Sequence, residues 1–134
     1  MEGNDGLEQA DSVNREVAEA LFQAINAQDV ESFHAQFHDD AVIEYPQSGE
    51  RIVGAQNRRG VYASFPARPT VRRIHSSGHL AIVEARVDYG DGVDWVAVFI
   101  LEARDAKIAK LICYWARPFP PSESRAAFVE PMDA

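Results

Sequence analysis

Apolar and polar residues alternate over three consecutive stretches in the second half of the chain, residues 79–89, 93–103 and 107–117. Their Val, Ile, Trp, Phe and Tyr residues are the types that fit a pleated, half-buried surface. Between the stretches lie Gly90-Asp91-Gly92 and Arg104-Asp105-Ala106, and Gly and Asp tolerate the positive φ that tight turns require. The pattern predicts three successive antiparallel strands, around which the rest of the chain is organised.

The first half of the chain has helical spacing instead. We predict a helix that starts near Asp11 or Ser12, either of which can cap it, and ends near residues 26–27. A second, short helix capped by Asp29 is expected to extend as far as Phe37, and the helical hairpin should pack its apolar stripe on the sheet. The residues that carry the first stripe are Val13, Val17, Ala20, Leu21, Ala24 and Ile25.

Shorter elements fill the middle of the chain. Strands are predicted at 41–45, 50–53 and 70–77, and Gly54 is expected to begin a third helix that runs to about Ser64. On each strand of the later meander, alternation sorts the side chains into two faces, and both faces are apolar enough to be covered. The helices would cover one face, and a second copy of the chain would cover the other.

The domain organisation is simple. The 134 residues are enough for one domain with a real core. We expect a mobile N-terminal tail over residues 1–11, one domain over 12–121 and a C-terminal tail over 122–134, whose Phe128 and Val129 could dock back on the domain.

Charge and cysteine content exclude several classes of function. A net charge of −8 argues against a nucleic-acid-binding face and against attachment to an anionic membrane, because both require basic surfaces. No apolar run approaches the roughly 20 residues that span a bilayer. Cys113 is the only cysteine, so the chain forms no internal disulfide and a reducing compartment, the cytoplasm, is expected.

Several motifs in order resemble the SnoaL-like group of the NTF2-like superfamily over about residues 12–121. They are Ala27-Gln28-Asp29-Val30-Glu31-Ser32-Phe33, Phe37-His38-Asp39-Asp40-Ala41-Val42-Ile43-Glu44-Tyr45-Pro46, Gly54, Lys107-Ile108-Ala109 and Tyr114-Trp115. The resemblance implies an α+β fold in which a curved antiparallel sheet wraps into a cone around three helices of the N-terminal half. It also implies an apolar cavity inside the cone and a homodimer formed through the sheet.

Arg86-Val87-Asp88 is the sharpest candidate for chemistry, because it resembles the Arg-x-Asp of limonene-type epoxide hydrolases. In that family an arginine fixes aspartates, one of which activates a water. That family's second aspartate would fall at Cys113, and its tyrosine and asparagine near Val42 and Glu44, so Glu44 could serve as the base. The alternative is an ion pair on a solvated or dimer face, which typically contributes little.

Two other chemistries of this superfamily fit less well. A ketosteroid isomerase would place its base at Tyr45 or Glu44 and its oxyanion donors near Leu21 and Phe99. The last two are apolar, and an isomerase needs both a base and donors, so we reject that reading. A scytalone-dehydratase-like reaction would use tyrosines and histidines, and Tyr45, Tyr62 and His75 qualify only by residue type.

Two histidines suggest a possible metal site. His34 and His38 are four residues apart, which would place both on one helix face. Phe33 and Phe37 already occupy the buried face of that helix, so both histidines are expected to face solvent. We therefore expect no metal, and no cofactor either.

The sequence predicts a small-molecule enzyme that uses a cavity carboxylate as acid or base on an apolar, oxygenated compound, as a lyase, an isomerase or an epoxide-hydrolase-like enzyme. The predicted catalytic residues are Asp88, Arg86 and Glu44. The alternative is a non-catalytic module for ligand binding or dimerisation in the same cone. The predicted partners are a small apolar molecule and a second copy of the chain. The predicted ligand-binding residues are Tyr45, Tyr62, Trp95, Phe99, Cys113 and Trp115.

Overall fold

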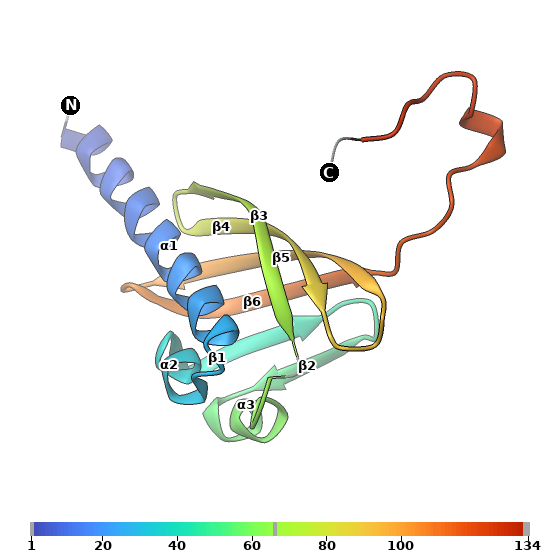
Figure 1. Ribbon diagram of the computed structural model, residues 1–134. Coiled ribbons are helices and arrows are strands. Elements are labelled where there is room, and N and C mark those ends of the chain that lie inside the picture. Colours follow the sequence, from blue (N-terminus) through green and yellow to red (C-terminus); the bar gives the residue numbers. More distant parts are fainter. Residues whose placement is uncertain (1, 66, 133–134) are drawn as a thin grey trace.

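A curved six-stranded sheet and three α-helices make up the part of the chain that the computed structural model describes, residues 2–65 and 67–132, with side chains from residue 13 onward (Figure 1). The order of strands in the sheet is β2-β1-β6-β5-β4-β3. The elements are α1 (Glu2–Asn26), α2 (Val30–Ala35), β1 (Phe37–Tyr45), β2 (Glu50–Val53), α3 (Ala55–Val61), β3 (Arg68–Ser77), β4 (Leu80–Asp88), β5 (Asp94–Arg104), β6 (Lys107–Ala116) and the 3-10 turn η1 (Glu123–Arg125).

The predicted meander is confirmed as β4, β5 and β6, with bounds that differ by one residue at most. The β5–β6 hairpin closes in two residues, because Arg104 pairs with Lys107. Asp105 and Ala106 have φ of 51° and 62°, as a two-residue turn with positive φ at both positions requires. The predicted strands at 50–53 and 70–77 correspond to β2 and β3.

The α+β fold is confirmed, but the sheet is mixed rather than wholly antiparallel. β1 runs parallel to β6, with Ile43 opposite Leu111. The two strands start together, since the Ile108 amide donates a 2.8 Å hydrogen bond to the Gln36 carbonyl just before β1. β2, α3 and β3 to β5 lie between β1 and β6 in the sequence, and a connection of this length allows two strands to pair in parallel.

Two predicted boundaries in the first half are wrong. Helix α2 ends at Ala35 and Phe37 already begins β1, whereas the sequence pattern continued the helix through Phe37. The ladder with β6 shifts register between Phe37 and Val42, and such a bulge breaks the alternation that would reveal a strand.

Helix α1 begins at Glu2 rather than near Asp11. Residues 2–12 contain Gly3 and Gly6, which are poor helix formers and favoured the prediction of a tail, but no proline, so no residue in them excludes helix. The predicted mobility of residues 1–11 stays a prediction, and Met1 lies outside the described residues.

The helices cover the concave face of the sheet, as expected. Helix α1 crosses β3 and β4 (Figure 1), burying Leu21 and Phe22, while the Arg15 guanidinium donates a 2.7 Å hydrogen bond to the Ile74 carbonyl. Helix α3 lies against β1 and β2 and starts at Gly54, whose φ of 84° suits glycine. The core therefore lies between the helices and one face of the sheet.

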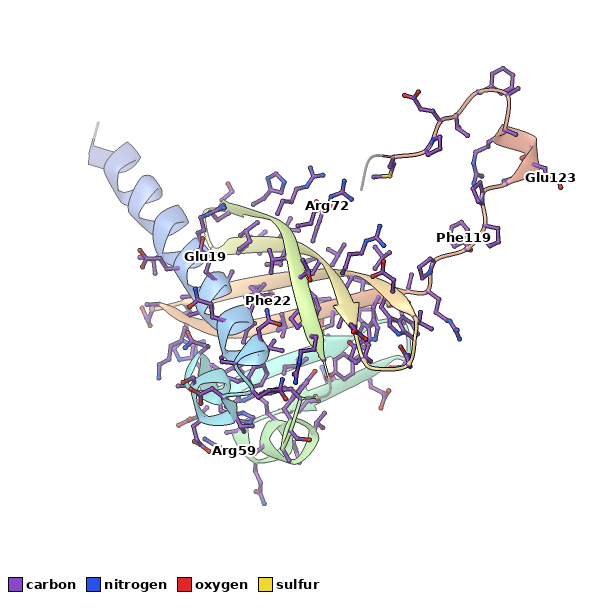
Figure 2. All side chains as sticks on the ribbon, viewed as in Figure 1. Glu19, Phe22, Arg59, Arg72, Phe119 and Glu123 are labelled. Atoms are coloured by element: carbon purple, nitrogen blue, oxygen red, sulfur yellow. The ribbon has the colours of Figure 1, made fainter. Side chains whose placement is uncertain are left out.

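The C-terminal segment, residues 117–132, extends away from the domain (Figures 1 and 2). Phe128 is 88% exposed and Val129 53% exposed, so the expected docking of these two side chains on their own domain is wrong. No helix in the described part of the chain is both long and apolar enough to cross a membrane.

Candidate functional site

A pocket of about 290 Å³ opens between α1, the end of α3 and the concave face of the sheet. Most of its lining is apolar, and the polar groups that line it are the hydroxyls, thiol and indole of Tyr62, Ser64, Tyr89, Cys113 and Trp115. Among the described residues that line the pocket, none carries a carboxylate, an imidazole, an ammonium or a guanidinium. Figure 2 places Phe22, one of the apolar lining residues, on the side of α1 that faces the sheet.

Two tyrosine hydroxyls meet beside this pocket. Tyr45 comes from β1 and Tyr62 directly follows α3, and their hydroxyl groups form a hydrogen bond. Burial raises the pKa of Tyr45 to about 12, and burial is also the main cause that raises the pKa of Tyr62. Both phenols are therefore neutral near pH 7, and one of the two protons remains available for another acceptor.

At the end of β1, Tyr45 faces the pocket and Glu44 faces away from it. Tyr45 packs its ring edge-on against Trp115, with centroids 5.2 Å apart. Glu44, one position earlier, forms a 3.1 Å ion pair with Lys110. Because successive side chains of a strand point to opposite faces, Glu44 lies on the outer face and does not reach the pocket.

Cys113 lies in the pocket wall as a thiol rather than a thiolate. It is only 3% exposed, and burial raises its pKa to about 12. The reactive form of cysteine is the thiolate, so Cys113 contributes shape and a weakly polar surface. Burial raises the pKa of the neighbouring Tyr89 as well, and its hydroxyl is likewise a neutral group in the wall.

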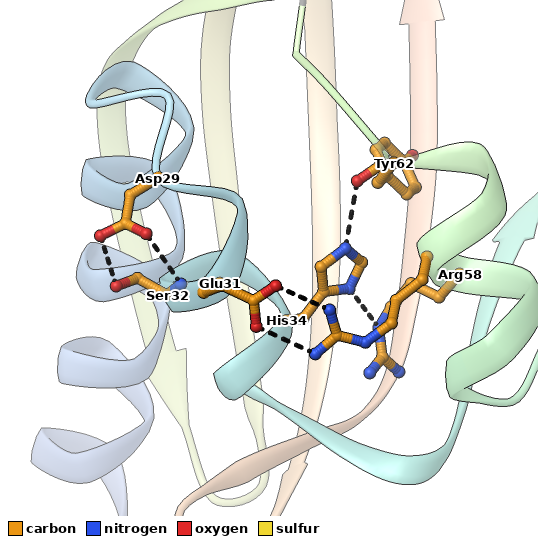
Figure 3. Close-up of polar contacts among 7 residues, drawn as sticks. Asp29, Glu31, Ser32, His34, Arg58 and Tyr62 are labelled. Carbon is orange, nitrogen blue, oxygen red and sulfur yellow. Dashed lines mark hydrogen bonds and ion pairs between the residues drawn. The ribbon is translucent and has the colours of Figure 1, made fainter.

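Behind Tyr62 lies a buried polar pair that sequence reasoning missed (Figure 3). His34 and Arg58 are 3% and 2% exposed. Arg58 donates from Nε to Nδ1 of His34 at 3.1 Å, and Nε2 of His34 lies 3.1 Å from the Tyr62 carbonyl. Guanidinium only donates, so the proton of this imidazole is on Nε2 and is donated to the Tyr62 carbonyl. Burial is the main cause that lowers the pKa of His34.

The expectation that His34 and His38 share a solvent-facing helix surface is therefore wrong. His34 lies in α2 and is buried, whereas His38 lies in β1 with Nε2 2.5 Å from the Arg104 carbonyl. Among the described residues, no three His, Cys, Asp or Glu side chains come together as ligands for a metal ion. No local pattern indicated the buried pair, because His34 directly follows Phe33 and was therefore expected on the exposed side of the helix.

The Arg58 side chain connects three elements. It also donates from a terminal nitrogen to the His38 carbonyl at 3.2 Å and stacks its guanidinium over the Phe37 ring at 4.7 Å. The neighbouring Arg59 instead donates to the carboxylate of the surface residue Glu31. Arg58 thus joins α2 and β1 to α3, the helix that Tyr62 directly follows.

The predicted catalytic residues lie away from the pocket. Arg86 pairs at 2.7 Å with Asp94 across the β4–β5 ladder, not with Asp88. An oxygen of the Asp88 carboxylate accepts a 2.7 Å hydrogen bond from the Gly90 amide in the turn. Arg86 and Asp88 are both exposed on the outer face, and with Glu44 on that face too the structure does not assemble the arrangement expected from Arg-x-Asp.

The predicted ligand-binding residues are placed differently. Tyr62, Phe99, Cys113 and Trp115 line the pocket, and Tyr45 adjoins it through Tyr62. Whether these side chains contact a ligand stays a prediction.

Trp95 lies at the start of β5 and does not line the pocket. Its indole donates a 3.0 Å hydrogen bond to Asp91 in the turn, its ring is 6.2 Å from that of Tyr89, and the Arg117 guanidinium lies 5.7 Å from its centroid. The structure therefore makes Trp95 part of the strand end rather than of the pocket wall.

Known structures resemble this chain over most of its length. An NTF-2 like protein of unknown function from Burkholderia xenovorans LB400 is 34% identical, with 91% of this chain and 97% of that chain covered and a TM-score of 0.82. A putative ketosteroid isomerase from Kribbella flavida DSM 17836 is 28% identical, with 96% and 93% covered and a TM-score of 0.81. An LEH-like epoxide hydrolase from M. tuberculosis, at 21% identity, 83% and 85% coverage and a TM-score of 0.64, shares the fold.

A search of curated proteins finds no match. The profile of the SnoaL-like domain, in contrast, matches residues 18–111. This range contains α2, α3 and β1 to β5, and with them the tyrosine pair and the buried His34 and Arg58. Together with the 34% identical NTF-2 like structure, it confirms the resemblance on which the fold was predicted. The chain belongs to the SnoaL-like domain family and has its NTF2-like α+β fold.

Proposed function

We propose that this protein binds a small, uncharged, mostly apolar molecule with at least one oxygen acceptor in the concave pocket. The observation that carries the proposal is the pocket wall, which combines apolar side chains with neutral hydroxyl groups and, among its described residues, has no charged group. Transfer of an ion into such a site is unfavourable without a counter-charge. An apolar molecule gains free energy from the same transfer.

The tyrosine pair gives the pocket a polar end. Tyr62 lines the pocket, and the hydroxyl of Tyr45, which lies outside the lining, forms a hydrogen bond with the hydroxyl of Tyr62. A carbonyl, ether or hydroxyl oxygen of the ligand would accept the remaining phenol proton, an interaction typically worth about 0.5–1.5 kcal/mol. Tyr89 offers a second donor from the end of β4.

The volume of the pocket limits the ligand. At about 290 Å³, it lies at the lower end of the roughly 300–1,000 Å³ usual for small-molecule sites. The ligand is therefore a compact molecule.

An enzymatic role for the same pocket is the second candidate. It is favoured by the tyrosine hydroxyls, which are donors of the kind that stabilise a developing oxyanion, and by the 28% identity to a putative ketosteroid isomerase. Proton abstraction also requires a base, and the described residues that line the pocket include no group with a pKa suited to that task. The arrangement favours binding over the carboxylate chemistry expected from the sequence.

Ligand screening with a product assay tests both roles. The protein would be heated with a panel of lactones, epoxides, enones and steroids, since a ligand of the folded state raises the melting temperature by mass action. We expect a hit whose Kd rises up to about tenfold in Tyr62→Phe and is unchanged in the matched Tyr114→Phe, which alters the outer sheet face.

Mass spectrometry of the hit then separates the two roles. Binding without product supports the proposed function. Product that forms with wild type and is lost in Tyr62→Phe makes the pocket an active site instead. No stabilising compound in the panel, or a hit indifferent to Tyr62→Phe, contradicts the proposed site.

A further inference from the structure

The C-terminal segment, residues 117–132, is an apolar arm without a surface to cover on its own domain. Phe119, Phe128 and Met132 are 78%, 88% and 77% exposed, and Val129 is 53% exposed. Figure 2 shows Phe119 and Glu123 on the arm, well away from the sheet. Large apolar side chains gathered in this way on an exposed surface mark an interaction site.

The arm has a defined form. Pro118, Pro120 and Pro121 favour an extended polyproline conformation. The turn η1 follows, and beyond it the Phe128 amide donates a 2.9 Å hydrogen bond to the Arg125 carbonyl. Because proline restricts φ, a proline-rich segment loses less conformational entropy when it binds. The start of the arm is therefore suited to docking in an extended form.

The outer face of the sheet carries an apolar band in the middle of β4, β5 and β6. Ile82 stands opposite Ile100, which stands opposite Ile112, and Val98 stands opposite Tyr114 in the next pairs of the ladder. Ile82 is 37% exposed and Tyr114 41% exposed. The band continues to Val96, which is 41% exposed.

Three ion pairs lie beside this band. The ion pairs are Arg73–Glu84, Arg86–Asp94 and Lys110–Glu44. Covering an unpaired charge is strongly unfavourable, whereas covering a paired one costs less. Arg86 and Glu44 thus lie in a surface that a partner can cover.

We propose that the arm of one chain lies across the apolar band of a second copy of the chain, and that the two copies exchange arms in a homodimer. The arm starts at the end of β6, the strand that carries Ile112 and Tyr114 of the band. Pro118 lacks the amide that would extend the ladder, and the arm leads away from its own sheet (Figure 1). A two-fold axis would place each arm on the partner's band, because such an interface uses the same patches twice.

The length of the arm permits this exchange. Residues 117–132 are 16 residues, which would span at most about 50 Å at ~3.1 Å per residue in the polyproline form, and the turn η1 shortens this length. A domain of about 100 residues has a radius of gyration of about 13 Å. The arm can therefore reach across the whole sheet of a neighbour. The exchange is independent of the ligand proposed for the pocket.

Sedimentation equilibrium tests the exchange. Wild type is expected to be a dimer, and a chain ending at Arg117, or the double variant Phe119→Ser with Phe128→Ser, should have a dimer Kd raised at least about tenfold. Glu130→Gln, a polar change on the same arm, should leave the Kd unchanged. A wild type that stays monomeric at 100 µM (roughly the upper range for a specific dimer), or a dimer indifferent to loss of the arm, overturns the proposal.

Photocrosslinking then locates the arm. Phe128 would be replaced by benzoylphenylalanine in a mixture of ¹⁴N and ¹⁵N chains, so that cross-links between chains carry a mixed mass. Mixed-mass links to peptides of β4, β5 or β6 support the proposal. Links within one chain, links to α1 or α3, or no link in a dimeric sample contradict it.

Discussion

Nε of Arg58 donates a hydrogen bond to Nδ1 of His34 in the interior of the protein, at 3.1 Å. This bond occupies the acceptor nitrogen of a neutral imidazole and leaves the other nitrogen to donate to the Tyr62 carbonyl. Protonation of His34 would place two cations in contact away from water. The neutral form of His34 is therefore the one that can accept from Arg58 and donate to the Tyr62 carbonyl at the same time.

The first prediction concerns stability against pH. Burial keeps the pKa of folded His34 below the 6.5 of the unfolded side chain, so the unfolded state binds more protons as the pH falls below about 6.5. The unfolding free energy should decline through this window, by up to ~1.4 kcal/mol per pH unit. His34→Gln keeps a donor and an acceptor without titrating, and it should remove this part of the decline in urea unfolding between pH 8 and 5.

The exposed His75 supplies the control, because His75→Gln should leave the pH dependence of wild type intact. Equal slopes for His34→Gln and wild type would show that His34 does not titrate in this way.

The second prediction compares adjacent arginines. Arg58→Ala would leave Nδ1 of His34 and the His38 carbonyl without their donor, and each buried unsatisfied group costs about 1–3 kcal/mol. We expect a loss of roughly 3 kcal/mol in unfolding free energy from urea denaturation. Arg59→Ala removes only the surface contact with Glu31 and should change stability little. Similar losses for both variants would contradict the structural role of Arg58.

The buried tyrosines give a third prediction, at alkaline pH. Burial raises the pKa of Tyr45 to about 12, above the 10.0 of an exposed tyrosine. The folded state therefore holds its proton longer, and the unfolding free energy should fall as the pH rises above 10. Phenolate absorbance near 295 nm should appear at higher pH in the folded protein than in urea. Tyr45→Phe should reduce this difference, and superimposable titrations of folded and unfolded protein would contradict it.

Alternation along the chain could predict the meander and the helical cover, because period and turn residues are local properties. Alternation also placed Arg86 and Asp88 on one face together with Ile82. It could not decide which face is concave, since both faces of β4 to β6 carry apolar residues. That decision depends on where α1 packs, a contact between distant segments.

Local sequence patterns could not predict the buried pair of His34 and Arg58 either, because it is also a contact between distant segments. The two residues are 24 positions apart and meet only because α3 packs against β1. The register shift after Phe37 hid the first part of β1, and so His38 was assigned to a helix. With β1 correctly placed, the pattern would have separated His34 from His38.

The last prediction distinguishes the two faces of the sheet by ligand affinity. Asp88→Asn and Glu44→Gln keep the hydrogen bonds to the Gly90 amide and to Lys110, and both positions lie on the face opposite the pocket. The Kd of the strongest panel ligand, measured by tryptophan fluorescence titration, should therefore change less than about twofold in either variant, because distant sites act independently. Phe99→Ala, which enlarges the pocket wall beside Phe22, should weaken binding in a protein that still unfolds cooperatively. If Asp88→Asn abolished binding and Phe99→Ala did not affect it, the ligand would bind on the outer face and not in the pocket. Such a result would support the catalytic role that the sequence predicted for Arg86 and Asp88.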